Sequence, residues 1–219
     1  PPRSTPKPSS AASDVYKRQI QYTITLNDYT TLKGEGFETI LNFANIGDSD
    51  AIVMGNYCTL ANLKIQGDIS TLPNSFTQRV IANSGCKIEN IWIDSMAYGI
   101  SISIEAENVT IKNNILSDGY YGVRLVSNNS VIKNEIANFI YGIEALGRNN
   151  TILKNNFVGN TRNAVFQAIP NTWDSNYWYN WKFSLPKPIF GMTGKLSLIP
   201  WIQFDYHPAK EPWKIGGGK

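Results

Sequence analysis

The chain has 219 residues, of which 42% are hydrophobic, and it contains no apolar run near the ~20 residues that a membrane-spanning helix needs. Its 20 basic and 17 acidic residues are spread along the chain and give a formal charge of +3, unlike the concentrated basic stripe of a nucleic-acid-binding protein. We therefore expect one substantial core, no transmembrane segment and no nucleic-acid partner.

Residues 1–19 do not resemble part of a folded domain. They read PPRSTPKPSSAASDVYKRQ, which is rich in Pro, Ser and charge, has no apolar period and lacks the apolar centre of a secretory signal. The string SSAASDVYKRQ also resembles translated adaptor sequence found at the ends of unrelated reading frames. We predict that residues 1–19 are a disordered or non-native tail and that an export signal of the natural protein is missing.

Two short motifs recur in phase after residue 58. The first ends in asparagine and occurs at 60–62, 88–90, 111–113, 132–134 and 153–155, with its last three copies 21 residues apart; Asn176 continues that step. The second begins with Tyr-Gly or its equivalent and occurs at 98–102, 121–125, 141–145 and 163–167. Repeats of this length indicate a stacked array, in which each unit buries its apolar face only against its neighbours.

Apolar and polar residues alternate within each unit. Val109 and Ile111, like Ile100 and Ile102, follow the period of a strand, and the units are too short for two packed helices. β-branched residues dominate the units, and Asn, Gly and Asp separate them. Three short strands per coil, each pairing in parallel with its equivalent one coil later at ~4.8 Å, predict an all-β right-handed parallel β-helix over residues 20–178.

The asparagine column is predicted to be structural. Asn tolerates the left-handed backbone conformation of a sharp bend, and equivalent amides on successive coils can hydrogen-bond along the helix axis. We expect this ladder to contain Asn62, Asn90, Asn113, Asn134, Asn155 and Asn176. In the second motif, Gly supplies backbone freedom, and we expect each Tyr to stack on the Tyr of the next coil.

The pattern N-x-T-I-x-N-N-x-I followed by Y-G-I-x-L resembles the β-helix repeat of NosD-like proteins and of the wider carbohydrate-binding and sugar-hydrolase group. The resemblance covers about residues 56–178, and TLKGEGFETIL at 31–41 resembles the first coil of pectate-lyase-like solenoids. It implies a pectate-lyase-like solenoid. NosD itself is implicated in maturing a copper site of nitrous oxide reductase, but such a repeat specifies fold far more than activity.

The composition changes after the last coil, where residues 171–213 hold five of the six Trp. We predict that residues 179–219 are an irregular Trp- and Pro-rich cap and tail, which closes the open end of the solenoid and folds back along its side. The phrase PWIQFDYHPAKEP resembles the tail of NosD-like proteins from archaea. Exposed aromatic rings also stack on sugars, which makes Trp201 and Trp213 candidate ligand contacts.

Outward-facing residues after the Tyr-Gly bend are expected to form the column Ser101, Arg124, Glu144 and Phe166. Arg124 and Glu144 then lie one coil apart, which favours a surface ion pair worth ~0.2–1 kcal/mol. The same two residues are the weak catalytic candidates, and Phe166 is a third candidate ligand contact. Because a lyase or glycosidase needs several converging carboxylates and no Asp-Asp pair occurs, the sequence favours a non-catalytic protein.

Candidate metal ligands are few. The chain has one His, His207, and two Cys, Cys58 and Cys86, whereas a Cu or Zn centre usually needs three or four such ligands. We predict no metal site and no cofactor, and we expect His207 to be hydrogen-bonded within the C-terminal tail. The sequence leaves open whether Cys58 and Cys86 form a disulfide.

The first hypothesis is a non-catalytic secreted or cell-surface β-helix module that recognises a polysaccharide or surface glycan, or acts as a rigid scaffold. The alternatives are a carbohydrate-active enzyme, either a polysaccharide lyase or a glycoside hydrolase, and a NosD-type factor in copper-site maturation. Residues 67–80 lengthen one turn, so we predict a ligand rim there. The ligand and the oligomeric state stay open.

Overall fold

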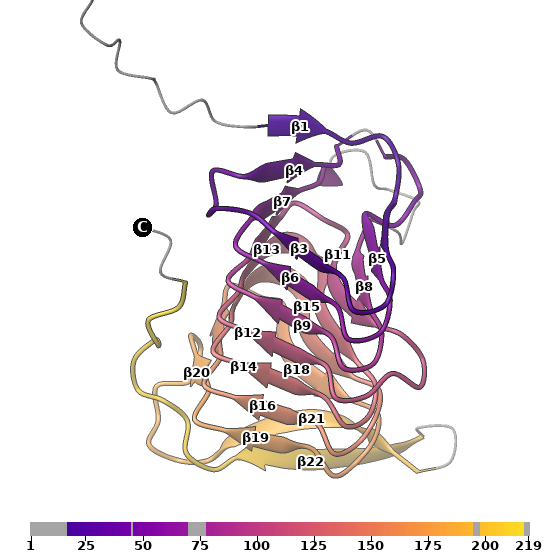
Figure 1. Ribbon diagram of the computed structural model, residues 1–219. Helices are drawn as coiled ribbons and strands as arrows, with labels where there is room; N and C mark the ends of the chain where they lie inside the picture. The colour runs from indigo at the N-terminus through magenta and orange to yellow at the C-terminus, as the bar shows by residue number, and fades with distance from the viewer. Residues whose placement is uncertain (1–16, 45, 70–77, 195–197, 217–219) are drawn as a thin grey trace, which may run out of the picture.

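Most strands of the computed structural model are three residues long, and each pairs in parallel with a strand one coil away (Figure 1). The structure describes residues 17–44, 46–69, 78–194 and 198–216. Its coils stack along one axis as a right-handed parallel β-helix, which confirms the predicted fold class. None of the described residues forms a helix that is long and apolar enough to cross a membrane.

Three sheets run along the solenoid, one for each strand of a coil. The first contains β1 (Lys17–Gln19), β4 (Ile40–Asn42), β7 (Lys64–Gln66), β10 (Trp92–Asp94), the first parts of β13 (Ile115–Leu125) and β15 (Glu135–Ala145), β17 (Asn156–Val158) and β20 (Tyr177–Trp178). The second contains β2 (Ile24–Leu26), β5 (Ile52–Met54), β8 (Val80–Ala82), β11 (Tyr98–Ile102), the last parts of β13 and β15, β18 (Arg162–Phe166) and β21 (Lys187–Thr193). The third contains β3 (Thr31–Lys33), β6 (Thr59–Ala61), β9 (Lys87–Glu89), β12 (Thr110–Lys112), β14 (Ser130–Ile132), β16 (Thr151–Leu153), β19 (Thr172–Asp174) and β22 (Ile199–Asp205).

In the core, equivalent residues of successive coils stack on one another in columns. In the first sheet the inward-facing residues in register are Ile65, Ile93, Leu116, Ile136, Phe157 and Trp178, none of them more than 1% exposed. In β5 and β8 of the second sheet the first and last residues are buried instead. Burying each such side chain contributes about 1.5–3 kcal/mol. The period-two pattern of the sequence therefore builds the core, because every coil places its apolar residues directly on those of the coil before.

The asparagine ladder differs from the predicted one: it begins at Asn114 and lacks Asn62, Asn90 and Asn113. Ile111 pairs with Val131, not with Ile132, so the coil between β12 and β14 is one residue shorter than the asparagine alignment assumed. The ladder consequently contains Asn114, Asn134, Asn155 and Asn176, all fully buried. Each donates from its backbone N and its side-chain Nδ2 to the residue one coil below, over 2.9–3.0 Å.

Asn62, Asn90 and Asn113 are bend residues and not ladder members. Their φ angles are 54°, 53° and 57°, the left-handed region that Asn tolerates. Lys133 and Lys154, with φ of 54° and 55°, occupy the same bend in later coils. The sequence prediction merged two adjacent columns, one for the bend and one for the ladder.

A second asparagine ladder runs along another corner of the solenoid. Asn129, Asn150 and Asn171 occupy successive coils, and the backbone N of each donates to the side-chain oxygen of the next residue, ending at Oε1 of Gln203. The first ladder ends at Asp205, two residues further along the same strand. Strand β22 therefore closes both ladders.

The C-terminal end differs from the irregular cap that we predicted. β21 and β22 pair along their whole length as an antiparallel hairpin, which lies at the foot of the solenoid in Figure 1. The hairpin covers the last coil because Ile189 packs into the core and β22 accepts the hydrogen bonds of both ladders. After β22 the chain runs back along the side of the solenoid, as expected, with Ala209 beside Tyr177.

The N-terminal boundary also differs from the prediction. Residues 17–19 form β1, which pairs with β4, so regular structure begins before residue 20. A segment of almost any composition can form a strand beside a sheet edge whose backbone groups are unpaired, and the composition of the segment does not reveal such an edge. Residues 1–16 and most of the predicted ligand rim, residues 70–77, lie outside the described residues.

Candidate ligand-binding groove

Arg124 and Glu144 form the predicted ion pair on the outside of the second sheet. They are register partners in β13 and β15, and Nε of Arg124 lies 2.7 Å from Oε2 of Glu144. The side chain of Gln167 donates to the other carboxylate oxygen over 3.3 Å. The negative charge of Glu144 is thus compensated and its carboxylate is held in place. This is the arrangement of a surface ion pair rather than of a free general acid.

Phe166 does not belong to this outward column. Val165 is the register partner of Glu144, and Phe166 pairs with Ala145, whose side chain faces the core. Phe166 is 1% exposed, so its prediction as a ligand-stacking ring was wrong. The cause is the same as in the asparagine ladder: the second motif at 163–167 is one residue out of register with the motif at 141–145.

The tyrosines of the second motif stack as predicted. The rings of Tyr98 and Tyr121 are 4.9 Å apart, and those of Tyr121 and Tyr141 are 5.0 Å apart. The glycine after each tyrosine permits this spacing, because a Cβ at Gly122 would lie 2.5 Å from the carbonyl oxygen of Gly142. Burial, followed by the Glu144 charge, raises the pKa of Tyr121 to about 12, so its hydroxyl stays protonated.

A groove of about 590 Å³ lies beside this tyrosine column, between β15, β18 and the hairpin strand β21. Its lining combines aromatic rings with polar and charged groups, including Tyr141, Arg162, Asn180, Lys187 and Phe190. Binding sites for small ligands typically combine such an apolar surface with a few placed polar groups. The ring of Phe190 is 61% exposed and is therefore accessible to a ligand.

The amide groups of the groove are held by the protein. The side chain of Asn160 donates to Oδ1 of Asn163 over 3.3 Å, and Asn163 donates to Oδ1 of Asn180 over 3.1 Å. A preformed polar wall costs less conformational entropy on binding than a mobile one.

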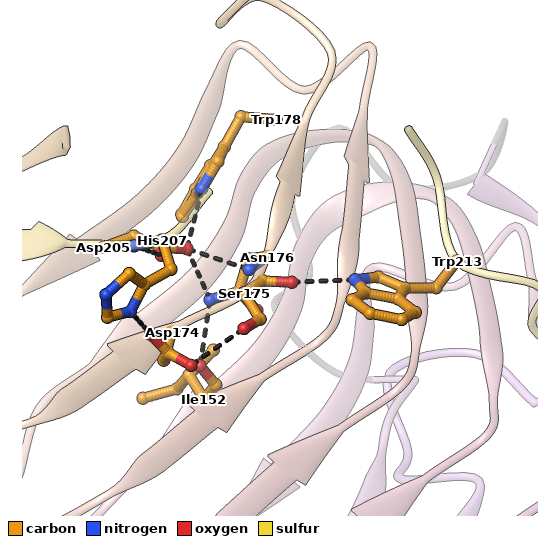
Figure 2. Close-up of polar contacts among 8 residues, drawn as sticks. All are labelled: Ile152, Asp174, Ser175, Asn176, Trp178, Asp205, His207 and Trp213. Carbon is orange, nitrogen blue, oxygen red and sulfur yellow. Dashed lines mark hydrogen bonds and ion pairs between the residues drawn. The ribbon is translucent and has the colours of Figure 1, made fainter. Parts of the chain in front are cut away.

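Trp201 and Trp213, the other two candidate rings, lie outside the lining of this groove. Trp201 is 51% exposed on the hairpin strand β22. Trp213 holds the C-terminal tail against the solenoid. Its backbone N donates to Oδ1 of Asn156 over 2.9 Å. Its indole N–H donates to the backbone oxygen of Ser175 over 2.7 Å (Figure 2). We interpret Trp213 as an anchor of the tail.

His207 also holds the tail, as expected. Its Nδ1 lies 2.6 Å from Oδ1 of Asp174, and Ser175 donates to the other oxygen of that carboxylate over 2.8 Å (Figure 2). Burial would raise the pKa of Asp174, but the hydrogen bonds from His207 and Ser175 outweigh it and hold that pKa below its ordinary value. The serine contacts the carboxylate and not the imidazole, so the three residues do not form a catalytic triad.

The described residues do not fit a copper centre. They contain no group of three or more His, Cys, Asp or Glu side chains that could hold a metal ion. Cys58 and Cys86 are free, buried thiols that directly precede β6 and β9, equivalent strands of adjacent coils, and each donates to a backbone carbonyl over 3.0 Å. Burial raises the pKa of Cys86, which disfavours the thiolate that binds metals.

Sequence reasoning missed Arg162, Asn180 and Lys187 because it missed the hairpin that forms one wall of the groove. A signal was present in IPWIQFD at 199–205, where Gln203 and Asp205 are two residues apart, as inward-facing strand residues are. The four prolines from 186 to 208 obscured it, since proline is rare inside paired strands.

Comparison with known proteins finds a family whose sequence pattern matches the repeated coils of this chain. Residues 78–183 match the family described as Periplasmic copper-binding protein (NosD). Searches of the curated proteins and of the solved structures found no significant match. The matched stretch spans β8 to β20 and includes both asparagine ladders down to Asn176. Over these coils the chain is a NosD-like right-handed parallel β-helix.

Proposed function

We propose that this protein is a non-catalytic β-helix module that recognises a glycan in the groove between β18 and β21. The observation that carries the proposal is the lining of that groove, in which the exposed Phe190 ring adjoins fixed amides and cationic side chains. Aromatic faces suit the apolar faces of sugar rings, and amides suit their hydroxyls. The rigid stacked coils support such a site without further ordering.

The carboxylates around the groove favour binding over catalysis. Glu144 is the only carboxylate in its lining among the described residues, and Arg124 pairs with it at 2.7 Å. Glycoside hydrolysis needs two carboxyl groups, one of which must be free to protonate the leaving oxygen. A glycan would therefore be retained without being cut.

A setting outside the cytoplasm accompanies this proposal. The family that residues 78–183 match is described as periplasmic, and polysaccharides are found at the cell surface. We propose an extracellular, periplasmic or cell-surface location. Detection of the native protein in fractionated cells would test it, and exclusive recovery from the cytosol would contradict it.

The proposed function is tested by incubating residues 17–219 with a panel of neutral and acidic polysaccharides, with and without Ca²⁺, and measuring retention and chain cleavage on the same samples. We expect retention of at least one polymer and no cleavage. Phe190→Ala should abolish retention, whereas Tyr29→Ala, which removes an exposed ring far from the groove in the chain, should not.

Two other variants separate the remaining possibilities. If Trp201→Ala abolishes retention and Phe190→Ala does not, the binding ring is on strand β22 and the groove assignment is wrong. Cleavage that disappears in Glu144→Gln would establish the alternative, a carbohydrate-active enzyme.

Copper-site maturation is the second candidate, favoured by the description of the matched family. The described residues do not provide a copper centre, so this role would require the protein to act as a scaffold for another protein's site. Equilibrium dialysis with Cu(I) and Cu(II) tests the direct version. Stoichiometric binding that disappears in Cys58→Ser and Cys86→Ser would show that the thiols bind the metal despite their burial.

A further inference from the structure

Two cations of the groove have no carboxylate partner among the residues that the structure describes. Arg162 and Lys187 both contribute to the lining. The ion pairs among the described residues are Lys64–Asp94, Arg79–Asp50, Arg124–Glu144 and His207–Asp174, so neither groove cation takes part in one. Such charges at a binding surface attract ligands of opposite charge.

Lys187 is partly buried beside aromatic rings. Its Nζ donates to the carbonyl oxygen of Pro188 over 3.1 Å and lies 5.0 Å from the centre of the Trp181 ring. Burial lowers the pKa of this lysine. An ammonium group has three N–H donors, and the carbonyl accepts only one of them. An incoming anion would take up the others and offset the cost of burying the charge.

Arg162, the first residue of β18, also contributes to this lining. Its central carbon lies 5.6 Å from the centre of the Tyr141 ring, at the end of the tyrosine column. Stacking on an aromatic ring orients the planar guanidinium group and leaves its N–H donors available in the plane. That planar fork matches the two oxygens of a carboxylate.

The negative charge of the groove is already compensated. Glu144 accepts from Arg124 over 2.7 Å and from Gln167 over 3.3 Å. Because Arg124 is not part of the lining, the charges that remain to face a ligand are those of Arg162 and Lys187. The groove therefore has an excess of positive charge next to its aromatic rings.

We infer that the groove selects glycans that carry carboxylate groups, that is, polymers containing uronic acid units. Arg162 and Lys187 bind the carboxylate, and Phe190 contacts the sugar ring. The inference rests on the proposed function and adds the substrate class to it. It gives roles to two residues that the repeat pattern does not mark.

The test uses polymers that differ only in charge. Polygalacturonate, alginate and hyaluronan are each compared with their methyl esters, which keep the backbone and remove the negative charge, by affinity electrophoresis at low and high salt. We expect at least one acid form to bind about tenfold or more tightly than its ester, as a charge-assisted hydrogen bond requires. The preference should shrink at high salt.

The matched variants are Arg162→Gln and Lys187→Gln in the groove and Lys112→Gln on an exposed position of β12 in the third sheet. Each removes one positive charge. Only the groove variants should weaken binding of the acid form, by about tenfold, and they should weaken binding of the ester much less. Circular dichroism on each variant checks that the β-helix is intact.

The outcomes separate this inference from the proposed function. Equal binding of acid and ester, or an equal loss in Lys112→Gln, would overturn the selection of carboxylates and leave glycan recognition standing. If none of these polymers and no neutral glycan is retained, both the proposed function and this inference are wrong.

Discussion

Asp205 terminates the first asparagine ladder by accepting two hydrogen bonds from Asn176, over 2.9 Å from its backbone N and 3.0 Å from its Nδ2. The same carboxylate oxygen accepts from the indole N–H of Trp178 over 3.0 Å (Figure 2). Asp205 is fully buried and stands where the next asparagine would be. A carboxylate suits the end of such a ladder because it only accepts, so no donor is left without a partner below it.

Removal of this terminus should destabilise the whole C-terminal end. In Asp205→Ala, the donors of Asn176 and Trp178 become buried and unpaired, which we expect to cost about 3–5 kcal/mol of unfolding free energy. Urea denaturation followed by tryptophan fluorescence measures it. Asp48→Ala, at an exposed turn, is the control and should change the stability by less than about 0.5 kcal/mol. Similar effects of the two variants would contradict the role of Asp205.

Asn113 and Asn114 should respond in opposite ways to glycine. Asn113 has a φ of 57° and sits at the bend, where glycine fits, so Asn113→Gly should be within about 0.5 kcal/mol of the natural protein. Asn114 accepts from the backbone N of Ile91 and donates to the carbonyl oxygen of Ile88. Asn114→Gly should cost about 2–4 kcal/mol. Thermal unfolding measures both losses of stability. A larger loss in Asn113→Gly than in Asn114→Gly would refute the assignment of Asn113 to the bend and Asn114 to the ladder.

The contact between His207 and Asp174 predicts release of the tail in acid. The pKa of Asp174 lies below its ordinary value of 3.8 in the folded protein, so its contribution to stability is present above that value. The contribution is lost as the pH falls below 3.8 and through the lowered pKa. The indole N–H signal of Trp213, followed by NMR, should shift in this range as the tail detaches. In Asp174→Asn the titration should disappear, and a persisting shift would assign it to another group.

Lys187 predicts a change of stability in alkali. Because burial lowers its pKa below 10.5, the charged form is disfavoured in the folded state at neutral pH, and this penalty is relieved as the pH rises towards 10.5. The unfolding free energy of the natural protein should therefore rise relative to that of Lys187→Met over this interval. Lys112→Met, from an exposed site, is the matched control for removal of a lysine charge. A constant difference across the interval would rule out the burial penalty.

The ion pair of Arg124 and Glu144 should be structural. Their side chains are 28% and 10% exposed, so a double-mutant cycle of Arg124→Ala and Glu144→Ala should give a coupling free energy of about 1 kcal/mol. Retention of a neutral glycan in Arg124→Ala should stay within about twofold of the natural protein, because Arg124 does not line the groove. Retention of an acidic glycan should fall, because Glu144 then presents an uncompensated negative charge to it. A coupling near zero would mean that the two charges act independently.

Local patterns were sufficient to predict the β-helix. Apolar residues at period two and β-branched residues at equivalent positions, such as Ile111 and Val131, specify strands that stack coil on coil. The tyrosine column and the Arg124–Glu144 pair were also predictable, because the repeated Tyr-Gly motif places equivalent residues of neighbouring coils side by side. Each of these relationships joins residues at the repeat interval.

Only the tertiary structure decided the register of the ladder, the C-terminal hairpin and the groove. One residue fewer between β12 and β14 moves the inward position from Asn113 to Asn114, and a repeat alignment does not reveal which residue faces inward. The hairpin forms because the last coil leaves donors that Gln203 and Asp205 accept, far along the chain from Asn171 and Asn176. Such pairing depends on which hydrogen-bonding groups the folded solenoid leaves unpaired, and these exist only once its coils have stacked.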